Sequence, residues 1–448
     1  MLPGILAQIK APVFPKRDFV ITRYGGVGDG RVNCSSAIEK AITACHKTGG
    51  GRVVVPPGNF LTGPIYLQSN VELHLDAGAR LSFSTEPNDY LPLVPSRWEG
   101  VDLMNYSPLV YAYKEHNIAV TGEGILDGRA DATHWWPWKG KPEYGWVAGT
   151  PSQTDPGSRT ALFAMSERNV PQKDRRFGEG FYLRPQFIQP YKCENVLIEG
   201  VSIINSPMWI LHPVLCQNVT IRKVRVESDG PNTDGCDPES CKNVLIKDCY
   251  FNTGDDCIAI KSGRNADGRR LNIPSENIVI QNCTMANGHG GIVIGSEISG
   301  GVKNVFAENC RMNSPLLDRV LRIKTSSARG GTTDGVFVRN ISVGQVKQET
   351  ILISMFYEDA GQYLPVICNI EVAHVQVEKG GKTGVVIEGY RQSSVANVRI
   401  SDLQIKEVDH PYQLSNVTGL RWNQVVINGQ AVTQEQVKVD QTEPKLHW

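Results

Sequence analysis

The sequence lacks the features that would assign it at once to a membrane or to a highly charged partner. Its 46 basic and 46 acidic residues give a formal net charge of zero, so bulk charge provides no attraction to nucleic acid or to an anionic membrane. It has no apolar run long enough to span a bilayer. We therefore expect neither membrane insertion nor a nucleic-acid partner, and an acidic substrate would have to be attracted by a local cluster of Lys and Arg.

Helical periodicity is also scarce, and a repeat of short β-rich segments takes its place. Each copy reads Asn-apolar-x-apolar and continues into a second run rich in Val and Ile, as in NVLIEGVSII from Asn195. Most copies lie between 22 and 34 residues apart, which suits one coil of a solenoid with alternating apolar and polar strand residues. The copies begin at Asn117, Asn195, Asn218, Asn243, Asn277, Asn304, Gly335, Asn369 and Asn397. The sequence predicts an all-β fold, a right-handed, single-stranded parallel β-helix.

Equivalent residues of successive coils should stack about 4.8 Å apart. The repeated Asn should form a ladder at one turn, where their amides bond to one another and to the backbone. Six Cys keep a fixed distance from these Asn: Cys249, Cys283 and Cys310 lie six residues after, and Cys193, Cys216 and Cys241 two residues before. Because other coils place Val or Ile at the first position, we predict that most Cys fill buried rows. The total of eleven is odd, so at least one is unpaired unless it bridges chains, and none has zinc-ligand spacing.

Two regions depart from the repeat. Residues 1–17 are interpreted as an extension that precedes a single β-helix catalytic domain at 18–448. Near its start, Ser36-Ala37-Ile38-Glu39 has the form of a capping box that opens a helix through about Cys45, and this helix would cover the end strand of the solenoid. A long Trp-rich insertion at about 128–180 interrupts the repeat, and irregular segments of that length are usually functional.

Four short motifs fall in consecutive coils. They are Asn232-Thr233-Asp234-Gly235, Gly254-Asp255-Asp256, Gly288-His289-Gly290 and Arg322-Ile323-Lys324. Taken singly, each is most often an ordinary turn, loop or exposed strand. The repeat register changes this interpretation, because it predicts where the motifs lie relative to one another.

Asp255 follows Asn243 by twelve residues, and His289 follows Asn277 by twelve, so both should occupy the same corner of adjacent coils. Ser240 and Ser262 end the strands that follow the other two Asp. Asp234 lies six residues before Ser240 and Asp256 six residues before Ser262, so these two Asp should stack one coil apart. Three adjacent carboxyls repel one another and raise at least one pKa, which is unfavourable unless the site uses it. The register therefore favours a functional site.

Glycosidic hydrolysis would use such a cluster. It needs one protonated carboxyl to donate to the leaving oxygen and one carboxylate to activate water. His289 would hold a proton and help to keep the acid protonated, or would simply close a turn. Strand alternation puts Arg322 and Lys324 on one face, where they would bind a sugar carboxylate. Tyr357, one coil further on, offers a hydroxyl and a ring face, or is an ordinary surface aromatic.

The motifs NTDG, DD, GHG and RIK, in that order on successive coils, resemble glycoside hydrolase family 28, the polygalacturonases and their relatives. The resemblance covers roughly residues 18–430. It implies that Asp255 is the general acid, that Asp234 and Asp256 position and deprotonate the attacking water, and that His289 supports the acid. It also implies inversion at the anomeric carbon with widely separated carboxyls, no metal and no cofactor, and substrate binding by Arg322, Lys324 and Asn232. Gly254 replaces the Gln of many fungal members.

Within the family, NYSPLVYA, HWWPWKGK and NSPMWILHPV look most like bacterial exo-acting members. An exo enzyme would release galacturonate from chain ends of galacturonan. Trp135, Trp136 and Trp138 would then form a stacking wall that blocks the cleft, or would anchor their own loop. Arg184 would be another carboxylate ligand, or a solvated strand residue.

Three other functions stay open at this point. A calcium-dependent pectate lyase would share the fold and use the three Asp as calcium ligands. A rhamnogalacturonan-directed hydrolase is the nearest relative in function, although Arg322 together with Lys324 favours galacturonate on the leaving-group side. A carbohydrate-binding β-helix without catalysis would have no reason to align three carboxyls with a histidine.

The compartment is inferred from the pectic substrate, which is extracellular. Residues 1–4 show neither the charged nor the apolar region of a signal peptide. We expect a secreted or periplasmic enzyme whose signal peptide has been removed, or a cytoplasmic one if the native gene encodes none. The sequence makes no prediction of oligomeric state.

Overall fold

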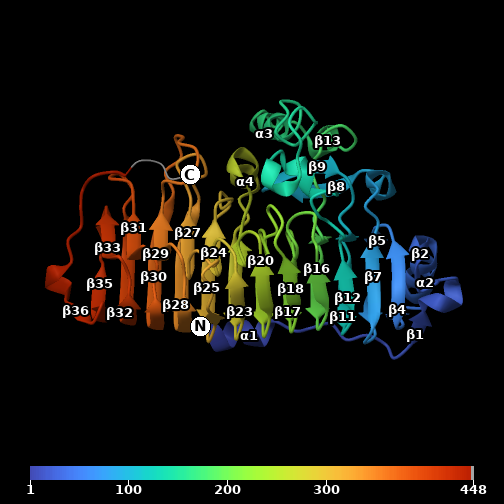
Figure 1. Cartoon of the computed structure of the whole chain (residues 1–448), viewed down its shortest axis with the longest axis horizontal. Helices are drawn as coiled ribbons and strands as arrows, with labels where there is room; N and C mark the ends of the chain where they lie inside the picture. Colours follow the sequence, from blue (N-terminus) through green and yellow to red (C-terminus); the bar gives the residue numbers. More distant parts are fainter. Residues whose placement is uncertain (445–448) are drawn as a thin grey trace.

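The computed structural model describes residues 1–444 and shows short strands stacked side by side along one axis (Figure 1). Strands of successive coils pair in parallel, and the connections return each strand beside the one before it. Parallel crossovers of this kind are right-handed because of the natural twist of the strands. The predicted right-handed parallel β-helix is confirmed.

Three columns of strands make up the sides of the coil, and their bounds are as follows. The first column holds β1 (Asp18–Val20), β3 (Gly51–Val55), β6 (Val71–Leu75), β11 (His116–Gly122), β15 (Glu194–Glu199), β17 (Gln217–Arg222), β19 (Lys242–Lys247), β22 (Ser275–Gln281) and β25 (Val302–Glu308). The second holds β2 (Asp29–Asn33), β4 (Gly58–Thr62), β7 (Ala79–Phe83), β12 (Ile125–Asp127), β16 (Ser202–Ile204), β18 (Arg225–Ser228), β20 (Tyr250–Thr253), β23 (Thr284–Asn287) and β26 (Arg311–Met312). In the later coils, one long strand runs through both columns: β28 (Thr332–Gln345), β30 (Val366–Lys379), β32 (Val395–Glu407) and finally β35 (Arg421–Ile427).

The third column carries the candidate site. It begins with β5 (Ile65–Tyr66), β10 (Val110–Tyr113) and β14 (Ile188–Tyr191), and single bridges continue it through residues 211–214 and 236–239. It then holds β21 (Ile258–Ile260), β24 (Ile292–Gly295), β27 (Leu321–Lys324), β29 (Glu349–Ser354), β31 (Thr383–Glu388) and β33 (His410–Ser415).

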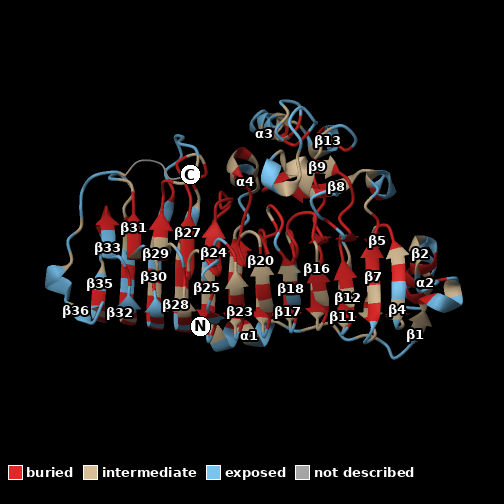
Figure 2. Ribbon diagram, in the orientation of Figure 1, coloured by how far each residue is buried: buried red, intermediate tan, exposed pale blue. Residues whose placement is uncertain are grey.

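The core consists of apolar side chains that point into the coil and stack in rows. Val219, Val244 and Ile278 are register partners on successive coils, and each is fully buried. Each such side chain contributes about 1.5–3 kcal/mol by leaving water. Figure 2 shows buried residues in the strands along the whole solenoid, interspersed with intermediate and exposed ones, whereas the outer segments of the lobe and of the two ends are more exposed.

The predicted Asn ladder is present. Asn277 donates from Nδ2 to Oδ1 of Asn243 at 2.9 Å, and Asn304 donates to Asn277 at 3.0 Å. The repeated Asn all take the left-handed conformation, with φ between 52° and 60° from Asn117 to Asn304; Asn tolerates this region better than most residues. The N-terminal extension interrupts the ladder between Asn218 and Asn243, where the side-chain amide of Asn218 bonds to the backbone of Lys10.

The Cys rows are buried as predicted. Cys249, Cys283 and Cys310 are at most 2% exposed, as are Cys193, Cys216 and Cys241. All eleven Cys lie among the described residues and carry free thiols. Burial and neighbouring thiols raise the pKa of Cys216 well above its ordinary value. These side chains therefore act as small apolar groups.

The N-terminal end is covered by α2 (Ser35–Lys47), which packs on β1, β3 and β5. The predicted helix is confirmed, but the predicted capping box is wrong. The N-cap is Cys34, two residues before the predicted Ser36, and the helix begins at Ser35. The side chain of Cys34 makes no capping bond, and Oδ1 of Asn33 accepts from the backbone N–H of Ser35 at 2.9 Å. The hydroxyl of Ser35 accepts from the backbone N–H of Gly63 at 2.7 Å. This bond connects the start of the helix to the solenoid. A short helix of the extension, α1 (Leu2–Gln8), lies against β19.

A lobe stands on the third column above the middle of the solenoid (Figure 1). It combines the antiparallel pair β8 (Val94–Trp98) and β9 (Val101–Asn105), α3 (Arg159–Glu167), β13 (Arg176–Phe177) and α4 (Asn265–Leu271). Its own apolar cluster contains Trp98, Leu162 and Phe177. At the other end, β34 (Val417–Thr418) and β36 (Gln430–Val432) complete the last coil. None of the described helices is long and apolar enough to cross a membrane.

The ladder should contribute measurably to stability. Asn277→Ala removes two side-chain bonds and leaves a β-carbon in the left-handed region, so we expect a loss of about 3 kcal/mol in the free energy of unfolding. Asn277→Gly removes the same bonds without the backbone strain and should cost about 1 kcal/mol less. Denaturant unfolding of both variants measures the difference, and equal losses would contradict the role of the backbone conformation.

Candidate active site

The outward side chains of the third column form the floor of the site. Arg322 pairs in register with Val293, and Lys324 with Gly295, so both cations point out of the same face of β27. The register prediction for the carboxyls is also confirmed. Cys236 bridges Ile258 on the next coil, which places Asp234 beside Asp256, two residues earlier on each coil.

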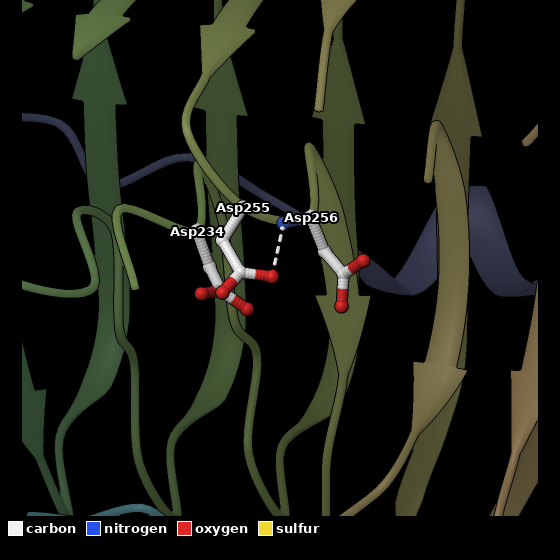
Figure 3. Close-up of side chains that lie close together, drawn as sticks. All are labelled: Asp234, Asp255 and Asp256. Carbon is white, nitrogen blue, oxygen red and sulfur yellow. Dashed lines mark hydrogen bonds between the residues drawn. The ribbon is translucent and has the colours of Figure 1, made fainter. Parts of the chain in front are cut away.

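Asp234, Asp255 and Asp256 are brought together (Figure 3). Each places a carboxyl oxygen within 4.8 Å of the others. Asp234 and Asp256 are buried, whereas the side chain of Asp255 keeps 19% of its exposure. This spacing is closer than the separation of about 6.5–9.5 Å usual in inverting glycosidases, so the wide carboxyl spacing predicted from the resemblance is wrong.

His289 reaches the cluster from the following coil. Its Nδ1 lies 2.9 Å from Oδ1 of Asp255, and the ring remains half-exposed. The glycine before it permits this approach, because a β-carbon at Gly288 would lie 2.4 Å from the carbonyl oxygen of Asp255. At Gly254 a β-carbon would lie 2.3 Å from the Gly230 carbonyl, so the Gln of other family members would need a different backbone here.

The charges of this pair stabilise each other. The carboxylate of Asp255 raises the pKa of His289 to about 9. Burial raises the pKa of Asp255, but the His289 imidazolium lowers it by a larger amount. The pKa of Asp255 therefore lies below the ordinary carboxyl range. The prediction that His289 keeps Asp255 protonated is therefore wrong in the absence of substrate. Burial, followed by the charges of Asp255 and Asp237, raises the pKa of Asp234 well above its ordinary value.

Asp256 is held by the two predicted cations. Nζ of Lys324 lies 2.8 Å from its Oδ2, and Nη1 of Arg322 lies 3.7 Å from its Oδ1. The ring of Tyr357 covers both cations, with its centroid 5.2 Å from Cζ of Arg322 and 5.1 Å from Nζ of Lys324. A groove next to them is lined by Arg322, Lys324 and Tyr357. Tyr357 thus belongs to the site, and its ring faces cations.

A buried lysine that sequence reasoning missed completes the floor. Nζ of Lys261 lies 3.6 Å from Asp234, 3.5 Å from Asp237 and 3.3 Å from Glu297. Burial raises the pKa of Asp237 well above its ordinary value, although Lys261 opposes this. The signal was available: in IAIKSG, Lys261 alternates with Ile260 as Lys324 does with Ile323, and therefore projects from the same face.

Arg184 does not have the predicted role. It is fully buried, and its guanidinium donates to the carbonyls of Pro207 and Pro231 and to the side chain of Asn232. It is therefore neither a ligand for substrate nor a solvated strand residue. Asn232 is at the site, since its Nδ2 donates to Oδ2 of Asp255 at 3.4 Å. Its Oδ1 also accepts from Lys139 at 2.7 Å, a second residue that sequence reasoning missed.

The three insertion tryptophans do not form a free stacking wall. Trp135 is buried and packs edge-on against Tyr90 and Trp138. Trp136 is half-buried and donates from Nε1 to the carbonyl of Ser206 at 2.9 Å, and Trp138 packs on Tyr182. These contacts match the alternative interpretation, in which the rings anchor their own loop. The predicted contact of Trp136 with substrate has no support in this packing.

Comparison with known proteins agrees with this geometry. The model of glycosyl hydrolases family 28 matches residues 178–429. The chain belongs to this family. A hyperthermoactive exopolygalacturonase from Thermotoga maritima has 46% identity and a TM-score of 0.92 over 96% of this chain and 95% of its own.

More distant relatives have the same type of name. A probable polygalacturonase of Vitis vinifera is 28% identical over 89% of this chain and 77% of its own length. An exo-poly-alpha-D-galacturonosidase of Dickeya chrysanthemi is 27% identical over 76% of this chain and 57% of its own length. As a family 28 member, the protein is a glycosidase.

The coupling between His289 and Asp255 can be tested by titration. We expect the imidazole of His289 to titrate at a pKa of about 9, and Asp255→Asn should lower this pKa towards the ordinary value of about 6.5, because the opposing charge is gone. NMR of ring-labelled histidine measures both. His212, buried against Glu239 at 2.9 Å, is the internal control and should not change. An unchanged His289 pKa in the variant would contradict the pairing.

Proposed function

We propose that this protein hydrolyses α-1,4-galacturonosyl linkages of pectic galacturonan from the chain end, releasing galacturonate with inversion. The observation that carries the proposal is the juxtaposition of three stacked carboxyls with the cation pair Arg322 and Lys324. The carboxyls supply acid and base, and the cations select an acidic sugar. The exo action is supported by the names of the Thermotoga and Dickeya relatives. It is also supported by the lobe beside Asp234, Asp255 and Asp256, which together are called the triad.

Asp255 is proposed as the general acid. The pair of His289 and Asp255 holds one proton up to about pH 9, because the histidine pKa is raised that far. A bound polyanion and the loss of water both disfavour the carboxylate form of Asp255. Substrate binding therefore moves the proton from His289 towards Asp255, from which the glycosidic oxygen takes it. Nδ2 of Asn232 steadies the other carboxyl oxygen.

Asp256 and Asp234 are proposed to hold and deprotonate the water. Buried oxygens of both, Oδ1 in each case, have no hydrogen-bond partner in the described chain, and a water between them would satisfy both. Neither suits a covalent route, because Asp256 is ion-paired with Lys324 and Asp234 lies 3.6 Å from Nζ of Lys261. Direct attack by water on the face opposite to the leaving group inverts the anomeric carbon.

No metal is proposed, although the triad has the geometry of a small cation site. The ammonium groups of Lys324 and Lys261 already provide positive charge to Asp256 and Asp234. The compartment is proposed to be extracellular or periplasmic, because pectin lies outside cells.

One assay tests these statements together. Wild type and Asp255→Asn are incubated with polygalacturonic acid and short oligogalacturonides in EDTA, with reducing ends and absorbance near ~235 nm followed and products resolved by chromatography. We expect galacturonate without new absorbance, and a loss of at least about 100-fold in kcat for the variant, since it cannot donate a proton. Proton NMR of the first product should show the inverted anomer.

Other outcomes would revise the proposal in distinct ways. Mixed oligomers would retain hydrolysis and overturn exo action. Rising absorbance that EDTA abolishes would indicate a calcium-dependent lyase. If wild type turns over none of these substrates, rhamnogalacturonan is tested next, and failure there would favour a non-catalytic carbohydrate-binding protein.

A further inference from the structure

The cations around the triad differ in whether they have a carboxylate partner. Lys324 is paired with Asp256 at 2.8 Å, and Lys261 lies between three carboxyls. Lys139 has no carboxylate within ion-pair distance in the part of the chain that the structure describes. Arg184 has none either, but it is fully buried and both of its Nη groups already donate to protein oxygens. Lys139 is thus the cation that remains available to an anionic ligand.

Lys139 is held close to the reaction centre. It ends the 3-10 helix η3 (Trp136–Lys139), which stands between the buried Trp135 and the left-handed Gly140. Its Nζ donates to Oδ1 of Asn232 at 2.7 Å, and Nδ2 of the same amide donates to Asp255 at 3.4 Å. One amide group therefore separates the ammonium from the proposed general acid.

The surroundings of Lys139 leave its charge uncompensated. Burial and then the charge of Arg184 lower the pKa of Lys139 to about 8, while Glu99 and Asp255 oppose this from a distance and Arg159 adds to it. Glu99 is already bound by Arg159 at 2.7 Å. A half-buried cation without a carboxylate partner is unfavourable, so a ligand carboxylate at this point would relieve the cost.

The position of Lys139 along the solenoid indicates which carboxylate that is. Asn232 belongs to the coil before Asp255, whereas Arg322 and Lys324 belong to the second coil after it. Cations therefore flank the carboxyls on both sides. Galacturonan carries one carboxylate on every ring, so a chain that straddles the carboxyls presents one to each side.

We propose that Lys139 binds the carboxylate of the galacturonate on the non-reducing side of the scissile bond and so makes the enzyme select an acidic terminal sugar. This inference rests on the proposed function and adds to it a specificity-determining residue from the insertion. The amide of Asn232 keeps the ammonium in place until the sugar carboxylate arrives.

The test compares two disaccharides: digalacturonide, and the same molecule with galactose as its non-reducing ring. Lys139→Met should lower kcat/KM for digalacturonide by roughly 30-fold or more and leave that for the neutral-ended analogue within about 3-fold of wild type. Lys141→Met is the matched control, because Lys141 is an exposed neighbour whose partner is Glu143 at 3.5 Å, and it should behave as wild type on both substrates.

Other results would overturn the inference. An equal loss on both disaccharides would mean that Lys139 only positions Asn232, and no loss on either would remove it from the site. Thermal unfolding checks that the variant is folded, and Lys139→Gln replaces it in the same comparison if it is not. Should wild type hydrolyse no galacturonide, the proposed function fails separately, and NMR titration with free galacturonate decides: binding that Lys139→Met abolishes supports the inference, and any other result overturns it.

Discussion

The parallel register between coils is the constraint on which the rest of the structure depends. Main-chain hydrogen bonds fix the coils about 4.8 Å apart, so whatever occupies one position of a coil lies directly beside its equivalent on the next. Apolar residues become continuous rows, as Val219, Val244 and Ile278 do. Asparagines become a ladder because each amide both donates and accepts along the axis. The same rule forces Asp234 and Asp256 together.

That last consequence is costly by itself and is made stable by cations from the same register. Burial and mutual repulsion both raise the pKa values of stacked carboxyls, and both raise the pKa of Asp234. Lys261 and Lys324 project from the same face two coils apart, and each lies on one of these carboxyls. His289 does the same for Asp255. The register that stacks the carboxyls therefore also brings the lysines that compensate their charge to the same face.

Whatever obeys the register could be predicted from the sequence. Counting from the repeated Asn located Asp255 beside His289, and counting from the strand ends located Asp234 beside Asp256; the same counting placed the Cys in buried rows. Arg322 and Lys324 followed from strand alternation. The protonation of the cluster did not follow, because counting gives neighbours but not the balance between burial and charge. The His289 imidazolium stabilises the carboxylate of Asp255, the reverse of the effect expected.

Two predictions for residues outside the repeat also failed, for a different reason. Arg184 seemed a surface cation, yet the carbonyls of Pro207 and Pro231, far away in sequence, enclose it. The capping box failed because the helix already begins at Ser35, so that Ser36 lies inside its first turn and not at the N-cap.

The difference between repeat and insertion also divides the chemistry of the site. The coils provide carboxyls one coil apart and the cations that balance them. The insertion contributes groups with no register partner, held instead by an aromatic anchor around Trp135. An insertion can change length or sequence without shifting the coils, because each coil contacts mainly its neighbours. In the proposed function, catalysis is therefore tied to the coils, whose register cannot shift, and recognition of the chain end to an insertion that can change independently. Asn232 is where the two parts meet, because its amide contacts both Lys139 of the insertion and Asp255 of the coils.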